Sequence, residues 1–591
     1  MENEENPIYP IDLSIFKDQI RQTLLNILDT LPPVEKTLIL EKACLSKLNY
    51  LTSLEPLKER QVRKELIILK SGSFVSDSPI IIYIITPQLE NVKIIEKHIE
   101  SNTKDFGSKD SNEAENKESF NKYHLIFIPK ISGECYSYIN NSKYKSYFNT
   151  HILNIDIFQL DYDLLSLENQ NSFRDIYVDK NLNSLSCLSR AIIKYETVFG
   201  RIKYKYSKGF YSKKLTEILN REEETLSSSL NNENETLACL IFDRNVDMVT
   251  PFCTNYIYEG ILDDYIGIDF NTISVNTKIL EKESKVDNIK KIDLSVKDKF
   301  YTLVKDFNYK KIQKFFPERL TELNKDKENL DKEKKVEKNS LTNHINLSDY
   351  IARNQKLPIF KFYQNMEKSL LKGELPNKLH DFIEDELSKK ANEYNLLKLI
   401  CLESIIHSGI KYKVYEQIKK DFLNIYGYQE IFLWHNLEKI EILKQQDNNS
   451  FYADANKKLQ LIFDNVDIND PNDISYTYNG YAPIFVRLIE KAISQGGWGA
   501  IRDILKKIPG ETNFPSDETD IFSTSVDKQF ILLVFIGGIT YGELAAIRYL
   551  NKKNNNKKFI VITTGIINSK KIFDSLKKGE YNLENQNSLT N

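Results

Sequence analysis

Two aspartates close to one arginine are the residues of this sequence with the clearest potential for chemistry. They stand in the stretch Leu240-Ile-Phe-Asp243-Arg244-Asn245-Val246-Asp247, which begins as an apolar run. Because sites in α/β proteins form at the carboxyl ends of strands, Asp243 and Asp247 could act as a carboxylate pair on a phosphoester. A phosphatase-type nucleophile requires a second acid two residues on, where this sequence has Asn245. The pattern therefore favours a buried ionic network of Arg244 with both aspartates, and a phosphoester hydrolase is the alternative.

Two adjacent glycines, Gly537 and Gly538, lie between a predicted strand and a predicted helix. This position is typical of a dinucleotide-binding loop. However, the fingerprint G-x-G-x-x-G and the phosphate-binding motif G-x-x-x-x-G-K-[ST] are both absent. Glycine also permits tight turns and close backbone packing. We therefore expect a structural role for this pair and no nucleotide cofactor.

The histidines and cysteines show no pattern of a metal or catalytic site. The seven histidines are dispersed, and no two share metal-ligand spacing on a helix. The six cysteines include no C-x-x-C pair, which argues against a zinc site or a disulfide scaffold and fits a reducing compartment. The sequence therefore predicts no catalysis, no metal and no cofactor.

The composition is that of an ordinary globular protein with several domains. The chain has 591 residues, of which 41% are hydrophobic and 28% charged, and its net charge is −3. This near-neutral balance gives no signature of nucleic-acid or membrane-surface binding. The start is acidic and polar, unlike a signal peptide, and the longest apolar runs are too short to span a bilayer. We therefore expect a soluble, cytoplasmic protein.

The first third of the sequence alternates between strand-like and helix-like stretches. Short isoleucine-rich runs predict buried strands of a parallel sheet at residues 66–69, 80–85, 124–128 and 152–157. A helix is predicted at residues 89–100. Such alternation is typical of a doubly wound α/β domain.

Further strand-like runs lie far apart in the sequence. Residues 237–242 form one predicted strand, whereas residues 530–536 and 558–563 form two more, with a helix at residues 541–550 between them. The two late strands have too little chain around them for a separate domain. We therefore expect them to join the sheet that contains residues 237–242, which makes this domain discontinuous.

The intervening region, from about residue 275 to 470, has a helical pattern. Residues 396–406 are apolar almost all round, which predicts a central buried helix. Residues 322–339 are almost entirely polar and charged, and they predict an exposed helix or a disordered loop. The polar inserts at residues 101–119 and 226–236 predict disordered surface loops.

One helical stretch has adjacent apolar residues that cannot all face a single core. Tyr426-Gly427-Tyr428 interrupts a helix, and residues 431–434 are then Ile-Phe-Leu-Trp. Successive residues of a helix point about 100° apart. Either this helix is buried on several sides, or it exposes an apolar patch to a partner. These residues by themselves leave both interpretations open.

The block LIFDRNVDMVTP at residues 240–251 is followed by Tyr258-Glu259-Gly260 and Asp263-Asp264. This set resembles the hallmark of the SM (Sec/Munc-like) family, whose members chaperone SNARE assembly. Three more blocks resemble the branch of vacuolar protein sorting-associated protein 33. They are YNGYAPIFVRL at residues 478–488, FIGGITYGELAA at residues 535–546, and residues 426–431 with residues 435–439.

The resemblance implies an α/β fold plus a largely helical domain, arranged as the three-domain arch of the SM family. Two domains would be α/β with parallel sheets, the second of them discontinuous. The implied boundaries are residues 1–158 for domain 1, residues 159–270 and 474–591 for domain 2, and residues 271–473 for domain 3, with the charged insert 322–339. The family has no enzymatic activity and no cofactor, which implies that Asp243, Arg244, Asp247, Gly537 and Gly538 form a structural motif.

For function, the resemblance implies a non-enzymatic protein that binds SNAREs and promotes membrane fusion in endosome-to-lysosome or vacuole transport. The implied partners are a subunit similar to vacuolar protein sorting-associated protein 16 and the other subunits of the HOPS and CORVET tethering complexes. Through them the protein would associate peripherally with late endosome, lysosome or vacuole membranes. In this branch the segment that matches Tyr428 and Ile431 lies where the 16-like subunit binds, which favours the exposed-patch interpretation.

The sequence departs from the family in the helical hairpin of domain 3. This hairpin and the neighbouring cleft with domain 1 hold SNARE segments in the family. The hairpin usually has an apolar Leu-Pro element near its tip, and here the charged run from Asn324 to Asn339 stands in its place. The alternative to SNARE templating is therefore a structural adaptor of the tethering complex.

Overall fold

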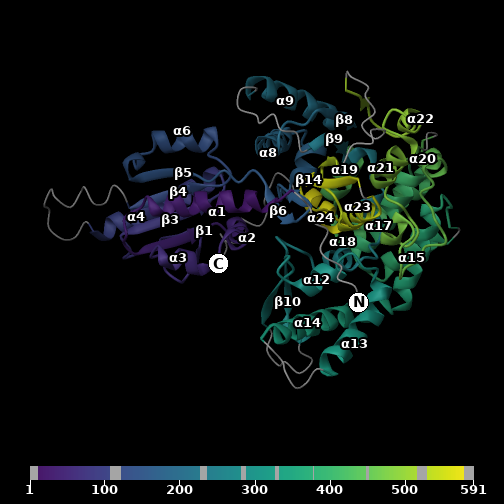
Figure 1. Cartoon of the computed structure of the whole chain (residues 1–591), viewed down its shortest axis with the longest axis horizontal. Coiled ribbons are helices and arrows are strands. Elements are labelled where there is room, and N and C mark those ends of the chain that lie inside the picture. Colours follow the sequence, from purple (N-terminus) through teal and green to yellow (C-terminus); the bar gives the residue numbers. More distant parts are fainter. Residues whose placement is uncertain are drawn as a thin grey trace. The chain divides into compact units, whose positions relative to one another are not determined.

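The computed structural model describes residues 11–106, 122–226, 236–280, 288–325, 332–376, 378–447, 451–515, 529–554 and 556–577. The chain divides into two compact units, one that ends at Tyr162 and one that begins at Asp163. Each unit contains a mostly parallel β-sheet with helices around it (Figure 1). The fold class is therefore α/β with many helices, as predicted.

The first unit is built around a five-stranded parallel sheet. Its strands, in spatial order, are β2 (Ile67–Ile68), β1 (Lys36–Leu40), β3 (Ile80–Ile85), β4 (Tyr123–Phe127) and β5 (Phe148–Ile152). A further strand, β6 (Phe158–Asp161), precedes the boundary between the units. The predicted strand at residues 152–157 is wrong, because β5 ends at Ile152. Leu153, Ile155 and Ile157 are buried, so their apolar character reflects packing of an extended segment.

Five α-helices of the described chain belong to this unit. They are α1 (Ser14–Asp29), α2 (Lys42–Leu51), α3 (Leu54–Glu59), α4 (Leu89–Phe106) and α6 (Gly133–Asn141). The predicted helix at residues 89–100 is confirmed but continues to Phe106. The first six residues of the polar insert 101–119 are therefore helical rather than a loop, and residues 107–121 lie outside the described residues.

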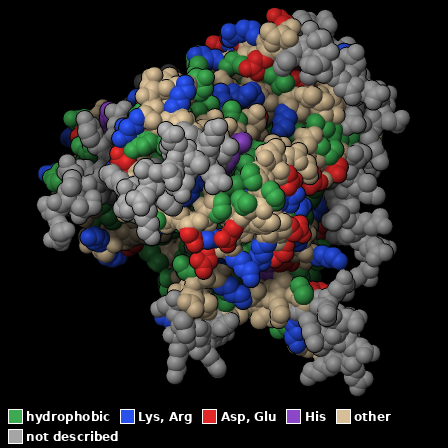
Figure 2. Space-filling model, turned by 90° about the vertical axis from the view of Figure 1, so that its left-hand side faces the viewer, with side chains coloured by type: hydrophobic (Ala, Val, Ile, Leu, Met, Phe, Trp, Pro, Cys, Tyr) green, Lys and Arg blue, Asp and Glu red, His purple; other side chains and the backbone are tan. Residues whose placement is uncertain are grey.

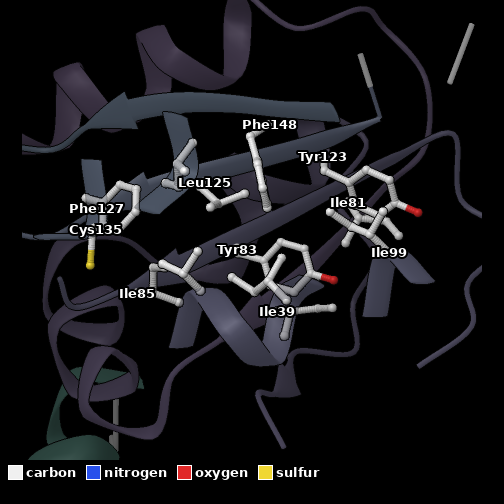
Figure 3. Packing of buried hydrophobic residues seen from close by; sticks show 13 residues of the cluster. Ile39, Ile81, Tyr83, Ile85, Ile99, Tyr123, Leu125, Phe127, Cys135 and Phe148 are labelled. Atoms are coloured by element: carbon white, nitrogen blue, oxygen red, sulfur yellow. The ribbon is translucent and has the colours of Figure 1, made fainter. Parts of the chain in front are cut away.

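One cluster of buried residues in the first unit lies on one face of this sheet, while residues of the other face, such as Ile82 and Ile84, are buried as well. Alternate residues of a strand share a face, and Ile81, Tyr83 and Ile85 of β3 lie beside Leu125 and Phe127 of β4 (Figure 3). Three apolar residues of α4, spaced at helical intervals, complete the cluster: Val92, Ile95 and Ile99. Continuous apolar runs and a helical apolar pattern, in separate stretches of sequence, thus pack together in this cluster.

The second unit contains a larger sheet built from distant parts of the chain. Within this unit the strand order is β12 (Thr512–Asn513), β8 (Tyr204–Lys208), β9 (Thr236–Asp243), β13 (Gln529–Ile536), β14 (Lys557–Thr563) and β7 (Leu164–Ser166). β12 pairs antiparallel with β8, and the other pairs are parallel. β13 lies between β9 and β14, and Figure 1 shows the yellow C-terminal elements beside the blue strands. The predicted joining of the late strands to this sheet is therefore confirmed.

Helices from three stretches of the chain accompany this sheet. They are α7 (Ser172–Tyr177), α8 (Asn183–Phe199), α9 (Phe210–Leu226), α10 (Tyr258–Tyr265), α21 (Ile484–Gln495), α22 (Arg502–Leu505), α23 (Tyr541–Lys553) and α24 (Ser569–Lys577). The predicted helix at residues 541–550 corresponds to α23. The insert at residues 226–236 begins at the end of α9 and ends at the start of β9, and residues 227–235 lie outside the described residues.

The region predicted to be helical contains α11 (Thr277–Leu280), α12 (Lys299–Val304), α13 (Tyr309–Lys325), α14 (Lys332–Gln355), α15 (Pro358–Leu371), α16 (Leu379–Ser388), α17 (Glu393–Ile406), α18 (Tyr412–Tyr426), α19 (Ile431–Lys439) and α20 (Phe451–Leu459). Short 3-10 helices of the described chain occur at η1 (Lys145–Tyr147), η2 (Arg244–Val246), η3 (Thr250–Phe252), η4 (Tyr428–Glu430) and η5 (Ile474–Thr477).

Within the helical region, residues 396–406 of α17 are buried almost all round, as the sequence predicts. An antiparallel pair, β10 (Thr272–Asn276) and β11 (Ile289–Asp293), was not predicted.

The charged segment 322–339 is helical wherever the structure describes it. α13 continues to Lys325 and α14 begins at Lys332, while residues 326–331 lie outside the described residues. Arg319 of α13 donates to Glu337 of α14 at 2.8 Å, so the two helices lie side by side. The sequence left open an exposed charged helix or a disordered loop. For the residues of this segment that the structure describes, the helix is correct.

The unit boundary at Tyr162 lies close to the predicted end of domain 1 at residue 158. The boundaries predicted for all three domains remain predictions. Across the described part of the chain, no helix combines the length and apolar character needed to cross a membrane. On the face drawn in Figure 2, basic and acidic side chains are interspersed, consistent with the near-neutral net charge.

The core of the first unit gives a test of the sheet assignment. Phe127 is fully buried in β4. Phe127→Ala is expected to lower the free energy of unfolding of this unit by about 3–5 kcal/mol, because truncating a core aromatic loses burial and leaves a cavity. Hydrogen exchange of the β3 and β4 amides measures this change. Tyr136→Ala, at a side chain that is 59% exposed, is the control, and equal protection in both variants would contradict the packing.

Candidate functional site

The sequence-predicted motif residues converge where β9 and β13 end side by side. Asp243 is the last residue of β9 and is fully buried. Its carboxylate accepts hydrogen bonds from the Tyr177 hydroxyl at 2.6 Å and from the Tyr211 amide at 2.9 Å. Burial raises the pKa of Asp243, and these hydrogen bonds oppose that rise. Asp243 therefore fixes the end of the strand to α7 and α9.

Arg244 has a partner that the sequence analysis did not assign. Its guanidinium, fully buried, donates to both carboxylate oxygens of Glu543, at 2.9 and 2.8 Å. It also lies over the Phe485 ring, 4.5 Å from the centroid. Glu543 in turn accepts from the Thr540 amide at 2.9 Å and caps α23. The sequence signal for Glu543 is Thr540-x-x-Glu543, the pattern of a helix capping box.

Asp247 joins a third segment of the chain to this centre. Its carboxylate accepts from the amides of Val249 and Thr250, at 3.1 and 3.0 Å, from the Thr250 hydroxyl at 2.6 Å, and from the Ile484 amide at 3.2 Å. Arg244 lies 3.5 Å away. Burial raises the pKa of Asp247, whereas Arg244 lowers it. The predicted network thus exists around Arg244 and Asp247, whereas Asp243 is held by hydrogen bonds.

The two glycines lie where side chains would collide. Gly538 has a φ of +104°, and a Cβ there would lie 2.4 Å from Cγ2 of Ile567. A Cβ on Gly537 would lie 2.5 Å from the Tyr177 ring. The space over the glycine pair is therefore filled by protein, which supports the structural interpretation over a phosphate-binding loop.

This arrangement does not provide an active site. The two aspartates are fully buried, and each is saturated by donors of the protein itself. A search of the described residues found no group of three or more histidine, cysteine, aspartate or glutamate side chains placed to hold a metal ion. A phosphoester hydrolase that uses Asp243 and Asp247 therefore has no support in this geometry.

The other predicted site residues lie on the surface, at η4 and the start of α19. Tyr428 is 70% exposed, Ile431 45% and Phe432 52%. These three side chains are called the η4–α19 surface. Such a group of large apolar side chains is typical of a protein-binding site. Phe432 was recognised from the sequence as part of the apolar run but was not predicted as a site residue.

The same short helix is anchored firmly beneath this surface. Leu433 and Trp434 are buried, and the Trp434 indole donates to the Tyr415 hydroxyl at 2.9 Å. On its other side, Asn436 donates to the backbone of Leu576 in α24 at 2.8 Å. Both interpretations of the apolar run are thus partly correct, because Ile431 and Phe432 lie on the surface whereas Leu433 and Trp434 lie in the core.

Asp247 provides the test of the buried network. Asp247→Ala removes the acceptor of four buried donors and one carboxylate from Arg244, so it is expected to lower the free energy of unfolding by about 3–5 kcal/mol. Chemical denaturation measures this loss. Asp503→Ala is the matched control, since the Asp503 side chain is 88% exposed. An unchanged denaturation midpoint in Asp247→Ala would contradict the network.

Known proteins resemble this chain over nearly its whole length. The model of the Sec1 family matches residues 36–575. The chain is 28% identical to a vacuolar protein-sorting-associated protein 33 homolog of Arabidopsis thaliana, over 96% of this chain and 97% of the relative. It is 25% identical to vacuolar protein sorting-associated protein 33A of Rattus norvegicus, over 96% and 98%.

A solved structure extends the likeness to the fold. The SM protein Vps45 in complex with the Qa SNARE Tlg2 superposes with a TM-score of 0.61 at 15% identity, over 96% of this chain and 98% of that chain. At this identity the likeness concerns the fold. The family match spans nearly the whole sequence, including the β9–β13–α23 centre. The chain therefore belongs to the Sec1 family of SM proteins, a non-enzymatic family, and is similar over nearly its full length to homologues of vacuolar protein sorting-associated protein 33.

Proposed function

We propose that this protein binds SNAREs and promotes their assembly in endosome-to-lysosome or vacuole transport, as a subunit of a HOPS or CORVET tethering complex. The observation that carries the proposal is the Sec1 family match over residues 36–575. The full-length similarity to the 33 homologues supports the vacuolar route. The Vps45 structure supports SNARE binding, because that SM protein is bound to a Qa SNARE.

The mechanism is the removal of an entropic barrier. A SNARE motif is an amphipathic segment that loses conformational freedom when it folds. A rigid surface that holds two such segments in register removes part of this loss before the bundle forms. The α13–α14 pair is the candidate surface, and its described charged residues, such as Arg319 and Glu337, match the polar faces of helical segments.

The η4–α19 surface is the proposed contact for a subunit similar to vacuolar protein sorting-associated protein 16. Its three apolar side chains are exposed, while Leu433 and Trp434 hold the helix in place from below. A preformed surface of this kind binds without first ordering its own backbone. Tyrosine is moreover enriched among the residues that dominate interface energies.

Charge substitutions on the η4–α19 surface test this contact. Tyr428→Asp and Ile431→Lys are expected to remove binding of the 16-like subunit, because each leaves an unpaired charge in an apolar interface. Co-purification of the two subunits measures binding, and the melting temperature checks the fold.

The chain offers matched controls for both substitutions. Tyr412→Asp changes a tyrosine that is 61% exposed at the other end of α18, about 21 Å away along the helix. Ile289→Lys changes an isoleucine that is 76% exposed in β11. The controls are expected to bind normally. Binding by folded Tyr428→Asp and Ile431→Lys would refute the proposed contact.

SNARE binding is tested with the wild-type chain, alone and together with the 16-like subunit. We expect the heterodimer to capture SNAREs and to accelerate their assembly in a fluorescence assay. A heterodimer that forms but binds no SNARE would favour the structural adaptor. If neither the subunit nor any SNARE binds, the proposed function is wrong.

A further inference from the structure

A pocket of 530 Å³ lies in the second unit and shares no lining residue with the β9–β13–α23 centre. Its walls come from the segment that leads into β8, the start of β8, the helix α9 and residues 513–515, which begin at the end of β12. This volume is within the range of pockets that hold small organic molecules. The charges of the wall indicate what such a molecule would be.

Three basic residues line the pocket, and they follow one another at intervals of two. They are Arg201, Lys203 and Lys205, whereas Ile202 and Tyr204 between them are buried. In an extended segment, residues two positions apart point to the same side. The local sequence therefore brings three cations to one wall of the pocket.

The carboxylates at this wall are fewer than the cations. Glu223 of α9 lines the pocket, and its carboxylate lies 2.6 Å from the Lys205 ammonium. A second carboxyl group, that of Glu196, is fully buried outside the lining, 4.0 Å from the same ammonium. Burial and the charge of Glu223 raise the pKa of Glu196 to about 7, so this group is only partly ionised at neutral pH. Even when both carboxyl groups are counted, the three basic residues leave a positive excess.

Arg201 has hydrogen-bonding capacity left for a ligand. Its side chain is 51% exposed, and within the described residues its guanidinium donates to Glu223 alone, at 3.3 Å. A guanidinium has five N–H donors in a planar fork that matches two oxygens of one anion. Asn220, which precedes Glu223 on the same side of α9, adds an exposed amide to the lining.

The rest of the wall includes apolar surface, which fits the organic part of a ligand. Phe514 and Pro515 line the pocket. The Arg502 guanidinium lies 4.5 Å from the centroid of the Phe514 ring, so a further positive charge stands beside the lining. A bare inorganic anion would leave this apolar surface and most of the volume unused.

We propose that this pocket binds a phosphate ester, with the phosphate held by Arg201 and Lys203 and the organic part against Phe514. Carboxylates also match a guanidinium fork, but a phosphate ester brings up to two negative charges to offset the excess of cations. The source is either a small soluble ester or the headgroup of a phospholipid. The inference does not depend on the proposed function, because every lining residue belongs to the isolated chain.

The test is calorimetric titration of the full-length chain with phenyl phosphate. Benzyl alcohol, which keeps the ring and lacks the charge, is the matched probe, and benzoate carries a single charge. We expect phenyl phosphate to bind, benzyl alcohol to bind at least about tenfold more weakly, and benzoate to lie between them. Equal binding of phenyl phosphate and benzyl alcohol, or no binding of phenyl phosphate, would overturn the proposal.

Substitutions in the lining locate the binding site. Arg201→Gln and Lys203→Gln are each expected to weaken phenyl phosphate binding about tenfold. Arg201→Gln removes one partner of the buried Glu223, whereas Lys203 is exposed, so Lys203→Gln is expected to leave the melting temperature unchanged. The matched controls are Lys506→Gln, at a side chain that is 68% exposed, and Arg353→Gln, at an exposed position of α14. Folded lining variants that bind like wild type, or controls that lose binding equally, would refute the site.

A second arm identifies the source of the phosphate. The chain is sedimented with phosphatidylcholine vesicles that contain phosphatidic acid, and with vesicles of phosphatidylcholine alone. Binding to the first kind only, lost in Lys203→Gln, would assign the pocket to a lipid headgroup. If a chain that binds phenyl phosphate ignores both kinds of vesicle, the ligand is a soluble ester. These measurements use neither SNAREs nor the 16-like subunit, so their outcome is independent of the proposed function.

Discussion

The ion pair between Arg244 and Glu543 is the interaction on which the second unit depends. It joins the end of β9 to the first turn of α23, across 299 positions of sequence, with both side chains fully buried. A buried charge without its partner is strongly destabilising, so the two distant segments can fold stably only together. Asp247 adds a third segment through the Ile484 amide. The glycine pair lets β13 turn toward α23 directly beside these charges.

This centre explains why the strongest sequence motif of the protein performs no chemistry. The carboxylates that could make a catalytic site instead accept hydrogen bonds from backbone amides and from a threonine hydroxyl, and one of them takes part in a helix cap. Their effect is rigidity in a sheet whose strands come from distant parts of the chain. A preorganised surface loses less conformational entropy when a partner binds, so this rigidity fits the proposed binding function.

The surface proposed for partner binding lies in the second unit, outside the buried motif. The η4–α19 surface exposes apolar side chains from a helix whose other side is buried and hydrogen-bonded. This surface leaves large apolar side chains exposed to solvent, which a stable fold tolerates at a few positions only when the rest is well packed.

The sequence by itself determined the elements with strong periodicity, namely strands β3, β9, β13 and β14 and helices α4, α17 and α23, and it determined that the late strands share a sheet with β9. The apolar pattern of each element is contained in its own stretch of sequence, and the chain around the two late strands is too short for a separate domain. Tertiary structure decided where β5 ends, since Leu153, Ile155 and Ile157 pack inward without being a strand. It also decided that Arg244 pairs with Glu543, because charge pairing over 299 residues leaves no local pattern beyond the helix cap. Only the fold, finally, could divide the run Ile431 to Trp434 between surface and core, since that division depends on what packs against α19 from α18 and α24.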